Sequence, residues 1–541
     1  MQGIKGAAAH AVAALFTIVT VAATVAGIAG TAGAADVTLR MRGGTFEVKG
    51  ELKSFDLKRW IVTAPGLGTL SLDAARYECV SEGCPTKPTS SQPVLRYPAR
   101  AVDTTWMGGS GIGTDYMPRL VRAYAQAVGA SVAMEVASDP KNLVLSLTTR
   151  DGRPVGRVIV ARQGVPPGFA GMARGEVDVV WTSRPIWPEE QQMMTAAGVA
   201  DMTAPDNQHV FGLDAMVVLV SRENPVVSMS LDTIAQIFAG KITDWSELGL
   251  PPGRITVYAP TAEMGLWSYF ESAVMRPRGL AITADAVRLL HATEWSDKVA
   301  ADPGGIGINF FAYIRKAKPV NVELTCGIVM PPSIFAAKNE EYPLARRLYF
   351  YTKGAPKNPL AAALLSFALS PRGQAVLKDA QFVDQEPELA PFSAHTGRIA
   401  VALNAADEDF DPKAMTRLIE EIRGASRATL TYRFAIGGAT LDSRANEDVS
   451  RLAELIKSPQ FAGKSVMLIG FSDAIGRFDA NLALARKRAQ VVRGALAKVL
   501  GAEAPAGVRV VDTAYGELAP VACNDSLEGR ALNRRVEVWV R

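Results

Sequence analysis

The feature that most constrains the fold is a long alternation of strand-like and helix-like segments in the middle of the chain. From about residue 95 to 385, short apolar runs bounded by turn residues alternate with amphipathic stretches. The run "DAMVVLVS" at 214–221 is typical of a buried strand. The stretch "LDTIAQIFAG" at 231–240 is typical of a helix that ends on glycine, and "LLSFALSPRGQAVLKD" at 364–379 of a helical pair broken at Pro371. This alternation predicts an α/β domain.

A chain of 541 residues is too long for one hydrophobic core, so we expect several domains. Strand-like segments between glycines predict a small β domain before the α/β region, and the Pro/Ser/Thr-rich "CPTKPTSSQP" predicts a linker. Near its end, the chain alternates strands and helices again and closes with the strand "RRVEVWVR". The expected parts are an export signal at 1–35, a small β domain at 36–92, an α/β domain at 93–390, a linker and helix at 391–424, and a compact α+β domain at 425–541.

The first residues predict an export signal. Lys5 is the only early charge, no Asp, Glu, Lys or Arg lies between 6 and 35, and small residues at 32–34 provide a cleavage site. The alternative is an uncleaved membrane anchor, because the apolar run is long for a signal.

The four cysteines and four histidines predict a disulfide but no metal site. Cys79 and Cys84 lie five positions apart in a turn-like segment, and in an exported chain this spacing favours a local disulfide over two free thiols. No histidine lies near a cysteine or another histidine, so we expect no metal, no cofactor and no enzyme activity. The net charge of +4 and the absence of a basic, aromatic patch exclude a nucleic-acid-binding protein.

The stretch "GFSDAIGRFDANLALARKRAQVV" at 470–492 places an acid and a base around a turn. Asp473 follows an apolar strand, Gly476 permits a close turn, and Asn481 and Arg488 are two helical turns apart. Arg488 borders an apolar stripe, where a guanidinium needs a partner. A pocket with Asp on one wall and Arg on the other suits a zwitterion. The alternative is a plain ion pair between Asp473 and Arg488.

This stretch resembles the OmpA-like C-terminal domain, which binds peptidoglycan non-covalently. The family pattern is a strand ending in Gly-His-Thr-Asp, a Gly, and then Asn-x-x-Leu-Ser-x-x-Arg-Ala-x-x-Val, and "GRALNRRVEV" at 529–538 matches the family's ending. The resemblance implies that Asp473 and Arg488 hold the amino and carboxylate groups of diaminopimelate in the stem peptide. It also implies supporting roles for Asn481 and for Ser472, which replaces the family's Thr. Phe471 stands where the family has His.

Residues from about 104 to 385 resemble the PstS-like periplasmic phosphate-binding proteins. The resemblance rests on "WMGGSGIGTDYMPRLVRAY", "GEVDVVWTSRPI" and "NPVVSMSLDTIAQIFAGKITDWSELG", in this order. It implies a two-lobed fold with a ligand cleft, where a Gly-rich loop that opens a helix favours an anion. The implied ligand-binding residues are Gly109, Ser110, Gly111, Ser183, Arg184 and Gly265. Arg184 has a structural role as its alternative.

The third ligand loop departs from the family pattern of Arg, three residues and Ser-Gly-Thr. Pro260 replaces the Arg, and Met264 and Leu266 replace the Ser and Thr. A buried anion needs donors, so we expect either a different ligand or a degenerate scaffold whose function is structural. The first hypothesis is a periplasmic or cell-envelope binding protein, associated with the wall and by extension with the outer membrane. Its implied partners are peptidoglycan, a phosphate-like anion and an ABC transporter.

Overall fold

The structure is a computed structural model. It describes residues 36–42, 44–55, 59–65, 68–74, 76–81, 84, 97–262, 264–404, 410–458, 461–501 and 507–541. The expected export signal and most of the expected linker before residue 97 lie outside the described residues. The chain divides into two compact units at residues 94 and 95, and each is described by itself.

The first unit is a small antiparallel sheet, as expected for a β domain. Its strand order is β4-β3-β2-β1-β5, and Val37, Leu39, Trp60 and Val62 form the buried face. Cys79, the last residue of β5, is bonded to Cys84 at a sulfur–sulfur distance of 2.06 Å, which confirms the predicted disulfide. The strands are β1 (Asp36–Met41), β2 (Glu47–Phe55), β3 (Arg59–Ala64), β4 (Gly68–Asp73) and β5 (Tyr77–Cys79).

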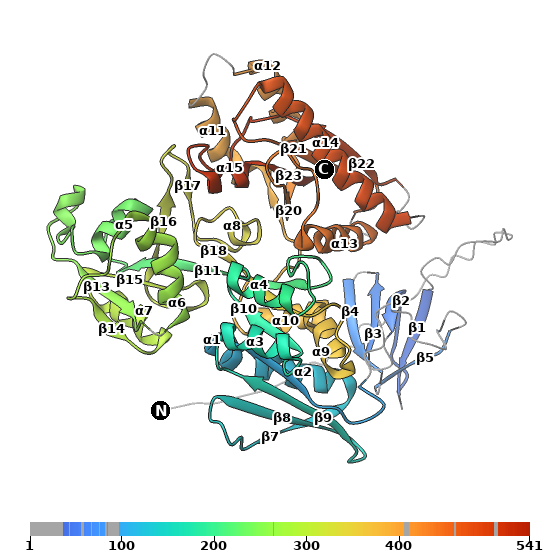
Figure 1. Ribbon diagram of the computed structural model, residues 1–541. Helices are drawn as coiled ribbons and strands as arrows, with labels where there is room; N and C mark the ends of the chain where they lie inside the picture. The colour runs from blue at the N-terminus through green and yellow to red at the C-terminus, as the bar shows by residue number, and fades with distance from the viewer. Residues whose placement is uncertain are drawn as a thin grey trace, which may run out of the picture. The chain divides into compact units, whose positions relative to one another are not determined.

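The second unit begins with a two-lobed α/β domain, as the alternation predicts (Figure 1). The first lobe is a sheet in the order β10-β6-β9-β8-β7, packed with helices around a core that includes Trp106, Tyr124 and Phe350. Its strands are β6 (Thr104–Gly108), β7 (Ala130–Glu135), β8 (Asn142–Thr149), β9 (Pro154–Ala161) and β10 (Val179–Thr182). Its helices are α1 (Ser110–Asp115), α2 (Met117–Val128), α3 (Val165–Arg174), α4 (Pro188–Ala196), α9 (Pro359–Leu369) and α10 (Pro371–Asp379).

Two long strands connect the lobes. β11 (Gln208–Val220) pairs with β18 (Ala345–Tyr351) along its first half and with the second-lobe strands β15 and β16 along its second half. β11 contains the predicted run "DAMVVLVS" except its final Ser221, and all of the residues of β11 from Val210 on are buried, as expected for a central strand covered on both faces.

The second lobe packs its strands and helices around Phe238, Phe270 and Trp295. The predicted helix at 231–240 is α5: Ser230 caps it by accepting a hydrogen bond from the Thr233 N–H, and Gly240 follows with a φ of 69°. The strands are β12 (Ser228–Ser230), β13 (Thr256–Pro260), β14 (Val287–Leu289), β15 (Gly305–Phe310), β16 (Lys318–Glu323) and β17 (Val329–Met330). The helices are α5 (Leu231–Phe238), α6 (Gly265–Phe270), α7 (Ala292–Ala301) and α8 (Ile334–Lys338), with short helical segments η1 (Trp245–Leu248), η2 (Glu271–Met275), η3 (Arg276–Arg278) and η4 (Phe311–Tyr313).

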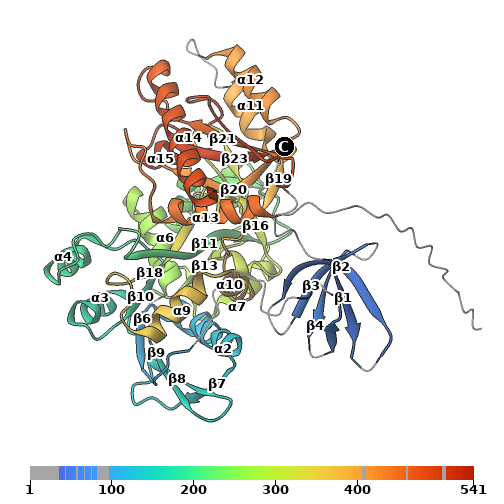
Figure 2. The same ribbon diagram turned by 90° about the vertical axis from the view of Figure 1, so that its right-hand side faces the viewer.

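The C-terminal part of the second unit is a five-stranded sheet with helices on both faces (Figure 2). The strand order is β19-β20-β23-β21-β22; α13 and α14 pack on one face, and α11 and α12 on the other. The segment expected as a linker and helix, 391–424, therefore contains two packed helices, α11 and α12, and the edge strand β19 lies at its start. The strands are β19 (Leu389–Pro391), β20 (Ser426–Arg433), β21 (Ser465–Phe471), β22 (Arg509–Ala514) and β23 (Arg535–Val540). The helices are η5 (Phe392–His395), α11 (Thr396–Asn404), α12 (Pro412–Ile422), α13 (Ser443–Lys457), α14 (Phe478–Leu500) and α15 (Leu527–Asn533).

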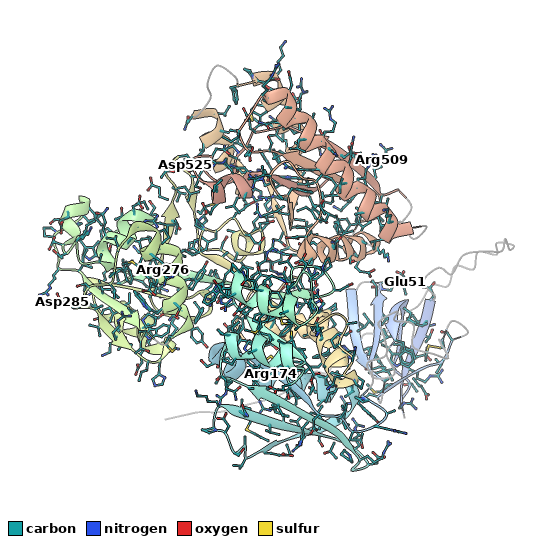
Figure 3. All side chains as sticks on the ribbon, viewed as in Figure 1. Glu51, Arg174, Arg276, Asp285, Arg509 and Asp525 are labelled. Atoms are coloured by element: carbon teal, nitrogen blue, oxygen red, sulfur yellow. A yellow bond between two sulfur atoms is a disulfide. The ribbon has the colours of Figure 1, made fainter. Side chains whose placement is uncertain are left out.

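The two-lobed domain and the C-terminal domain are joined covalently and by buried ion pairs. A second disulfide, which the sequence analysis did not predict, connects Cys326, after β16, to Cys523, before α15, across 197 positions. Arg427 on β20 pairs with Glu341, which follows α8. Other charged side chains lie on the exterior, among them Arg174, Arg276 and Arg509 (Figure 3).

Candidate binding sites

The cleft between the two lobes contains a cavity of about 380 Å³. Its first-lobe wall is built at the carboxyl ends of β6 and β10, which are parallel neighbours, so that the loops after them meet at one edge of the sheet. Five of the six predicted ligand residues line this cavity: Gly109, Ser110, Gly111, Ser183 and Gly265.

Close packing determines the shape of the Gly-rich loop. A Cβ on Gly108 would lie 2.2 Å from the Trp181 carbonyl oxygen, so this position requires glycine. The Trp181 indole N–H donates to the Gly109 carbonyl at 2.9 Å, which fixes the loop against β10. Helix α1 then starts at Ser110, and no side chain caps its first turn. The loop therefore presents backbone N–H groups and the Ser110 hydroxyl at the cavity.

The structure places Arg184, the sixth predicted residue, outside the cavity lining. Its guanidinium donates to both carboxylate oxygens of Glu190, at 2.8 and 2.6 Å, and lies 3.6 Å above the Trp187 ring centre. Glu190 also accepts the Trp187 N–H at the start of α4. These contacts, in the turn before α4, are of the kind expected for its structural alternative.

Two other arginines line the cavity instead. Arg346 on β18 donates to the Asp214 carboxylate on β11 at 2.7 and 3.1 Å, and both side chains are largely buried on the strands that connect the lobes. Arg162 donates to the carbonyls of Lys141 and Pro140 and to the Thr114 hydroxyl. The sequence analysis missed both arginines. A charge inside the apolar run of β11 was the available indication for Asp214, because a buried carboxylate needs a cationic partner.

The second-lobe wall of the cavity is mostly apolar. Met264, Leu266, Phe310 and Tyr313 line it beside Gly265. The cleft is therefore asymmetric. Hydrogen-bond donors line the first lobe and the connecting strands, together with the carboxylates of Asp115 and Asp214, and the second lobe presents mostly hydrocarbon and the Tyr313 hydroxyl. Such an arrangement can hold an anionic group against the first lobe.

The second candidate site lies at the end of β21 in the C-terminal domain. Gly470 contacts the backbone of α14 so closely that a Cβ would lie 2.2 Å from the Ala485 carbonyl oxygen. This contact places the loop after β21 beside the helix that carries Asn481 and Arg488. Gly476 turns the loop with a φ of 100°, as the sequence predicts.

Arg488 is fully buried and incompletely bonded. Its Nε donates to the Gly438 carbonyl at 2.9 Å and its Nη2 to the Ala435 carbonyl at 3.2 Å, but its Nη1 is buried without a hydrogen-bond partner among the described residues. Burial and, to a smaller extent, the charge of the nearby Arg534 lower the pKa of Arg488 to about 10, against an opposing effect of Asp473. The group keeps its charge at neutral pH.

Asp473 does not pair with Arg488 in the structure, so the alternative of a plain ion pair between the two predicted residues is not formed. Its carboxylate accepts from Arg534 Nη1 at 2.6 Å. The Ser472 hydroxyl is buried without a hydrogen-bond partner among the described residues, and Asn481 donates to Glu517 at 3.2 Å. Phe471 is buried under the Arg535 guanidinium, 4.1 Å from its ring centre. The sequence analysis missed Arg534, although it lies in the quoted motif "GRALNRRVEV".

Comparison with known proteins assigns both domains. Residues 130–372 match the model of the PBP superfamily domain, and residues 433–534 match the model of the OmpA family. The chain thus contains a region similar to the PBP superfamily domain, followed by a region similar to the OmpA family; these regions are called the PBP domain and the OmpA domain. Both resemblances found in the sequence, and the mixed α/β fold class, are therefore confirmed.

Two curated relatives match the region of the PBP domain, and one of them is named for phosphate binding. Protein SphX of Synechococcus elongatus is 30% identical over 233 residues, which are 40% of this chain and 66% of SphX. Phosphate-binding protein PstS of Staphylococcus aureus is 24% identical over 226 residues, which are 40% of this chain and 67% of PstS. The chain thus spans about two thirds of the length of these relatives. An ABC-type phosphate transport receptor from Vibrio cholerae aligns with 52% of this chain and 99% of its own, with a TM-score of 0.40 and 17% identity.

Among the described residues, no single helix has both the length and the apolar composition needed to cross a membrane. Helices α9 and α10 meet these criteria only when they are counted together, and the chain bends by 73° between them. Within the same residues, no group of three or more His, Cys, Asp or Glu side chains is arranged to hold a metal ion.

Proposed function

We propose that this chain is a non-catalytic cell-envelope protein that captures a small anion in the cleft of its PBP domain and is held non-covalently to peptidoglycan by its OmpA domain. The two halves of the proposal rest on different residues. Each half therefore has its own experiment.

The observation that carries the wall-binding half is the unpartnered Nη1 of Arg488. A buried guanidinium N–H without an acceptor is unfavourable, and the carboxylate of a diaminopimelate stem peptide supplies that acceptor. Asp473, on the loop beside α14, supplies the acceptor for the amino group, and it exchanges its bond to Arg534 for one to the ligand. Ser472 and Asn481 complete the site.

The wall-binding half is tested by co-sedimentation with purified peptidoglycan. Wild-type protein is expected to pellet with the wall, and the double variant Asp473→Ala, Arg488→Ala to stay in the supernatant. If the double variant pellets as wild type does, these two residues are not the site.

The solute-binding half is supported by the donors in the cleft. The N–H groups after Gly109, the Ser110 and Ser183 hydroxyls and the Arg346 guanidinium surround a cavity of a size suited to a small ligand. The name of one relative, Phosphate-binding protein PstS, makes phosphate the first anion to test. A protein of this kind delivers its solute to an ABC-type transporter, which we propose as the partner.

Calorimetric titration of phosphate into the purified protein tests the solute. Micromolar binding that Ser110→Ala weakens about tenfold would support phosphate capture, since a hydrogen bond to a charged group contributes on the order of 1.5–3 kcal/mol. Absence of heat at millimolar phosphate would exclude phosphate.

A second candidate function is structural, and the apolar second-lobe wall favours it. Met264 and Leu266 provide no donors where a tightly held phosphate would need them. In this case the PBP domain is a scaffold, and the protein organises the envelope through its OmpA domain alone. The two functions differ in one result: a scaffold binds the wall normally but shows no saturable binding of phosphate, arsenate or sulfate.

A further inference from the structure

A second cavity, of about 560 Å³, lies between the PBP domain and the OmpA domain. One wall comes from β17 and α8 of the PBP domain, and the other from η5 and α11 and from Val521 of the OmpA-domain side. Gly327 and Val521, both of which line the cavity, lie one and two positions from the cysteines of the Cys326–Cys523 disulfide. The disulfide therefore holds the two walls of the cavity together.

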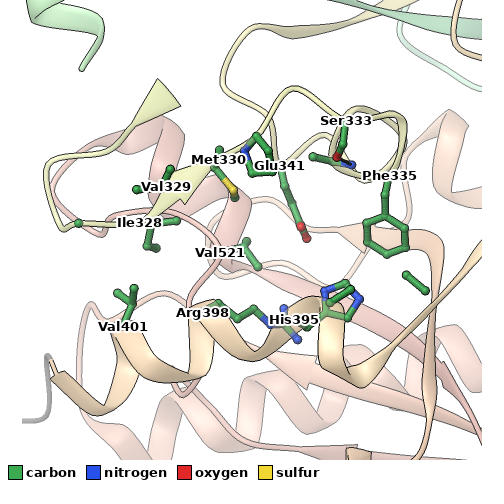
Figure 4. A pocket seen from close by; sticks show the side chains of 16 residues that line it. Ile328, Val329, Met330, Ser333, Phe335, Glu341, His395, Arg398, Val401 and Val521 are labelled. Atoms are coloured by element: carbon green, nitrogen blue, oxygen red, sulfur yellow. Dashed lines mark hydrogen bonds between the residues drawn. The ribbon is translucent and has the colours of Figure 1, made fainter. Parts of the chain in front are cut away.

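The cavity has an apolar part and a polar end (Figure 4). Ile328, Val329, Met330 and Val401 gather on one side of the close-up, and the Glu341 carboxylate, Arg398 and His395 lie toward the other side. Phe335 lies beside His395, 5.0 Å between ring centres. An apolar space with ionisable groups on one side is suited to an amphiphile.

The polar end belongs to a buried cluster of three guanidinium groups and two carboxylates, which carries one excess positive charge. Glu537 accepts from Arg398 at 2.5 and 2.9 Å and from Arg535 at 2.7 Å, and it lies 3.4 Å from Arg427. Arg427 in turn donates to both oxygens of Glu341. Burying an uncompensated charge is unfavourable, so the cluster favours an anion nearby.

Two hydrogen-bonding nitrogens at this end lack a partner among the described residues. They are the Nε of Arg398, whose side chain is 9% exposed, and the Nε2 of His395. Arg398 and His395 both line the cavity, so an acceptor placed there can satisfy them. Burial, together with the charges of Arg427 and Arg398, lowers the pKa of His395 to about 3, against the smaller opposing effect of Glu537 and Glu341. The ring is therefore neutral at neutral pH and carries one N–H.

We propose that this interdomain cavity binds a monocarboxylate with an apolar tail, with its carboxylate at His395 and Arg398 and its tail along Ile328, Met330 and Val401. The anionic head compensates the excess charge of the cluster and accepts from the two unpartnered nitrogens. The site is separate from the cleft and from the Asp473–Arg488 site, and it uses residues of both domains. A bound amphiphile would therefore contact both the solute-binding domain and the wall-binding domain.

The head group is tested by calorimetric titration of decanoate, decanol and decylammonium into the purified protein, with the two ions below their micelle concentrations and decanol below its solubility limit. Decanoate is expected to bind saturably at one site per chain, and the two others at least about tenfold more weakly, because they lack the anionic acceptor. Equal binding of decanol and decanoate would overturn the carboxylate assignment.

The position is tested with two tryptophan variants of α11. Val401→Trp fills the cavity and is expected to abolish decanoate binding. Leu403→Trp, on the same helix but exposed and outside the lining, is expected to leave it unchanged. If both variants bind as wild type does, the ligand does not occupy this cavity.

Nuclear magnetic resonance of the imidazole groups gives an independent readout. Decanoate is expected to raise the pKa of His395, because a carboxylate beside the ring stabilises its protonated form. The His395→Phe variant, which keeps a ring of similar shape, is expected to bind decanoate about tenfold more weakly and decanol unchanged. An unshifted His395 at saturating decanoate would contradict the proposed contact.

Discussion

The Arg488→Lys substitution separates charge from geometry at the proposed wall-binding site. Arg488 is buried on α14, and two of its nitrogens hold the carbonyls of Gly438 and Ala435 while Nη1 remains for a ligand. A lysine at this position keeps the positive charge, but its single ammonium cannot satisfy both carbonyls and a ligand carboxylate in the forked geometry of a guanidinium.

The magnitude follows from the hydrogen bonds that are lost. A charge-assisted bond to the stem-peptide carboxylate contributes roughly 1.5–3 kcal/mol, which corresponds to about a 10- to 150-fold loss of affinity. Loss of one carbonyl partner also destabilises the OmpA domain by about 1–3 kcal/mol. The unfolding midpoint of the variant is therefore measured alongside binding.

The assay is co-sedimentation with purified peptidoglycan over a range of wall concentrations. The matched control is Arg493→Lys, one and a half turns further along α14, where an exposed guanidinium pairs with Asp512 at 2.7 Å. The control is expected to bind as wild type does, since surface ion pairs contribute little. Wall binding by Arg488→Lys that equals that of Arg493→Lys would refute the two-point recognition argued here.

Three further predictions concern the folded state. Replacing Cys326 and Cys523 by serine removes a cross-link over 197 positions and is expected to lower the free energy of unfolding by up to about 5 kcal/mol, measured by denaturant titration of the oxidised wild type and the variant. Burial holds the pKa of His395 in the folded state below its unfolded value of 6.5. Below pH 6.5 the unfolded chain therefore binds more protons than the folded chain, so the free energy of unfolding decreases as the pH falls. The His395→Phe variant is expected to lose roughly 1 kcal/mol less of its free energy of unfolding than wild type between pH 7 and 5.5, measured in thermal melts. Arg346→Met leaves the Asp214 carboxylate buried and unpaired and is expected to lower the free energy of unfolding by about 3–5 kcal/mol. Adding Asp214→Asn is expected to restore most of this loss, because the buried charge is then removed. A double variant that is no more stable than Arg346→Met would contradict the pairing.

Local sequence patterns were sufficient to predict several helices and strands and part of each candidate site. Apolar runs and caps predicted β11 and α5, and the order of glycine, serine and acid predicted the loops that carry Ser110 and Asp473. These features depend on residues within a few positions of each other in the sequence, and over that range the order of apolar, polar and capping residues determines the backbone geometry and the burial pattern. The disulfide between Cys79 and Cys84 was within reach for the same reason, because its spacing is short.

The sequence by itself determined the fold class, the two domain families and the residues that begin each site. Only the tertiary structure decided the partners of the charged groups: Arg534 for Asp473 across 61 positions, Arg346 for Asp214 across 132, and Cys523 for Cys326 across 197. Such partners are chosen by distance through space, and that distance depends on how whole sheets and helices pack. A buried charge without a partner is unfavourable, so we expect each one to have a partner. The local spacing of the sequence does not indicate which residue that partner is.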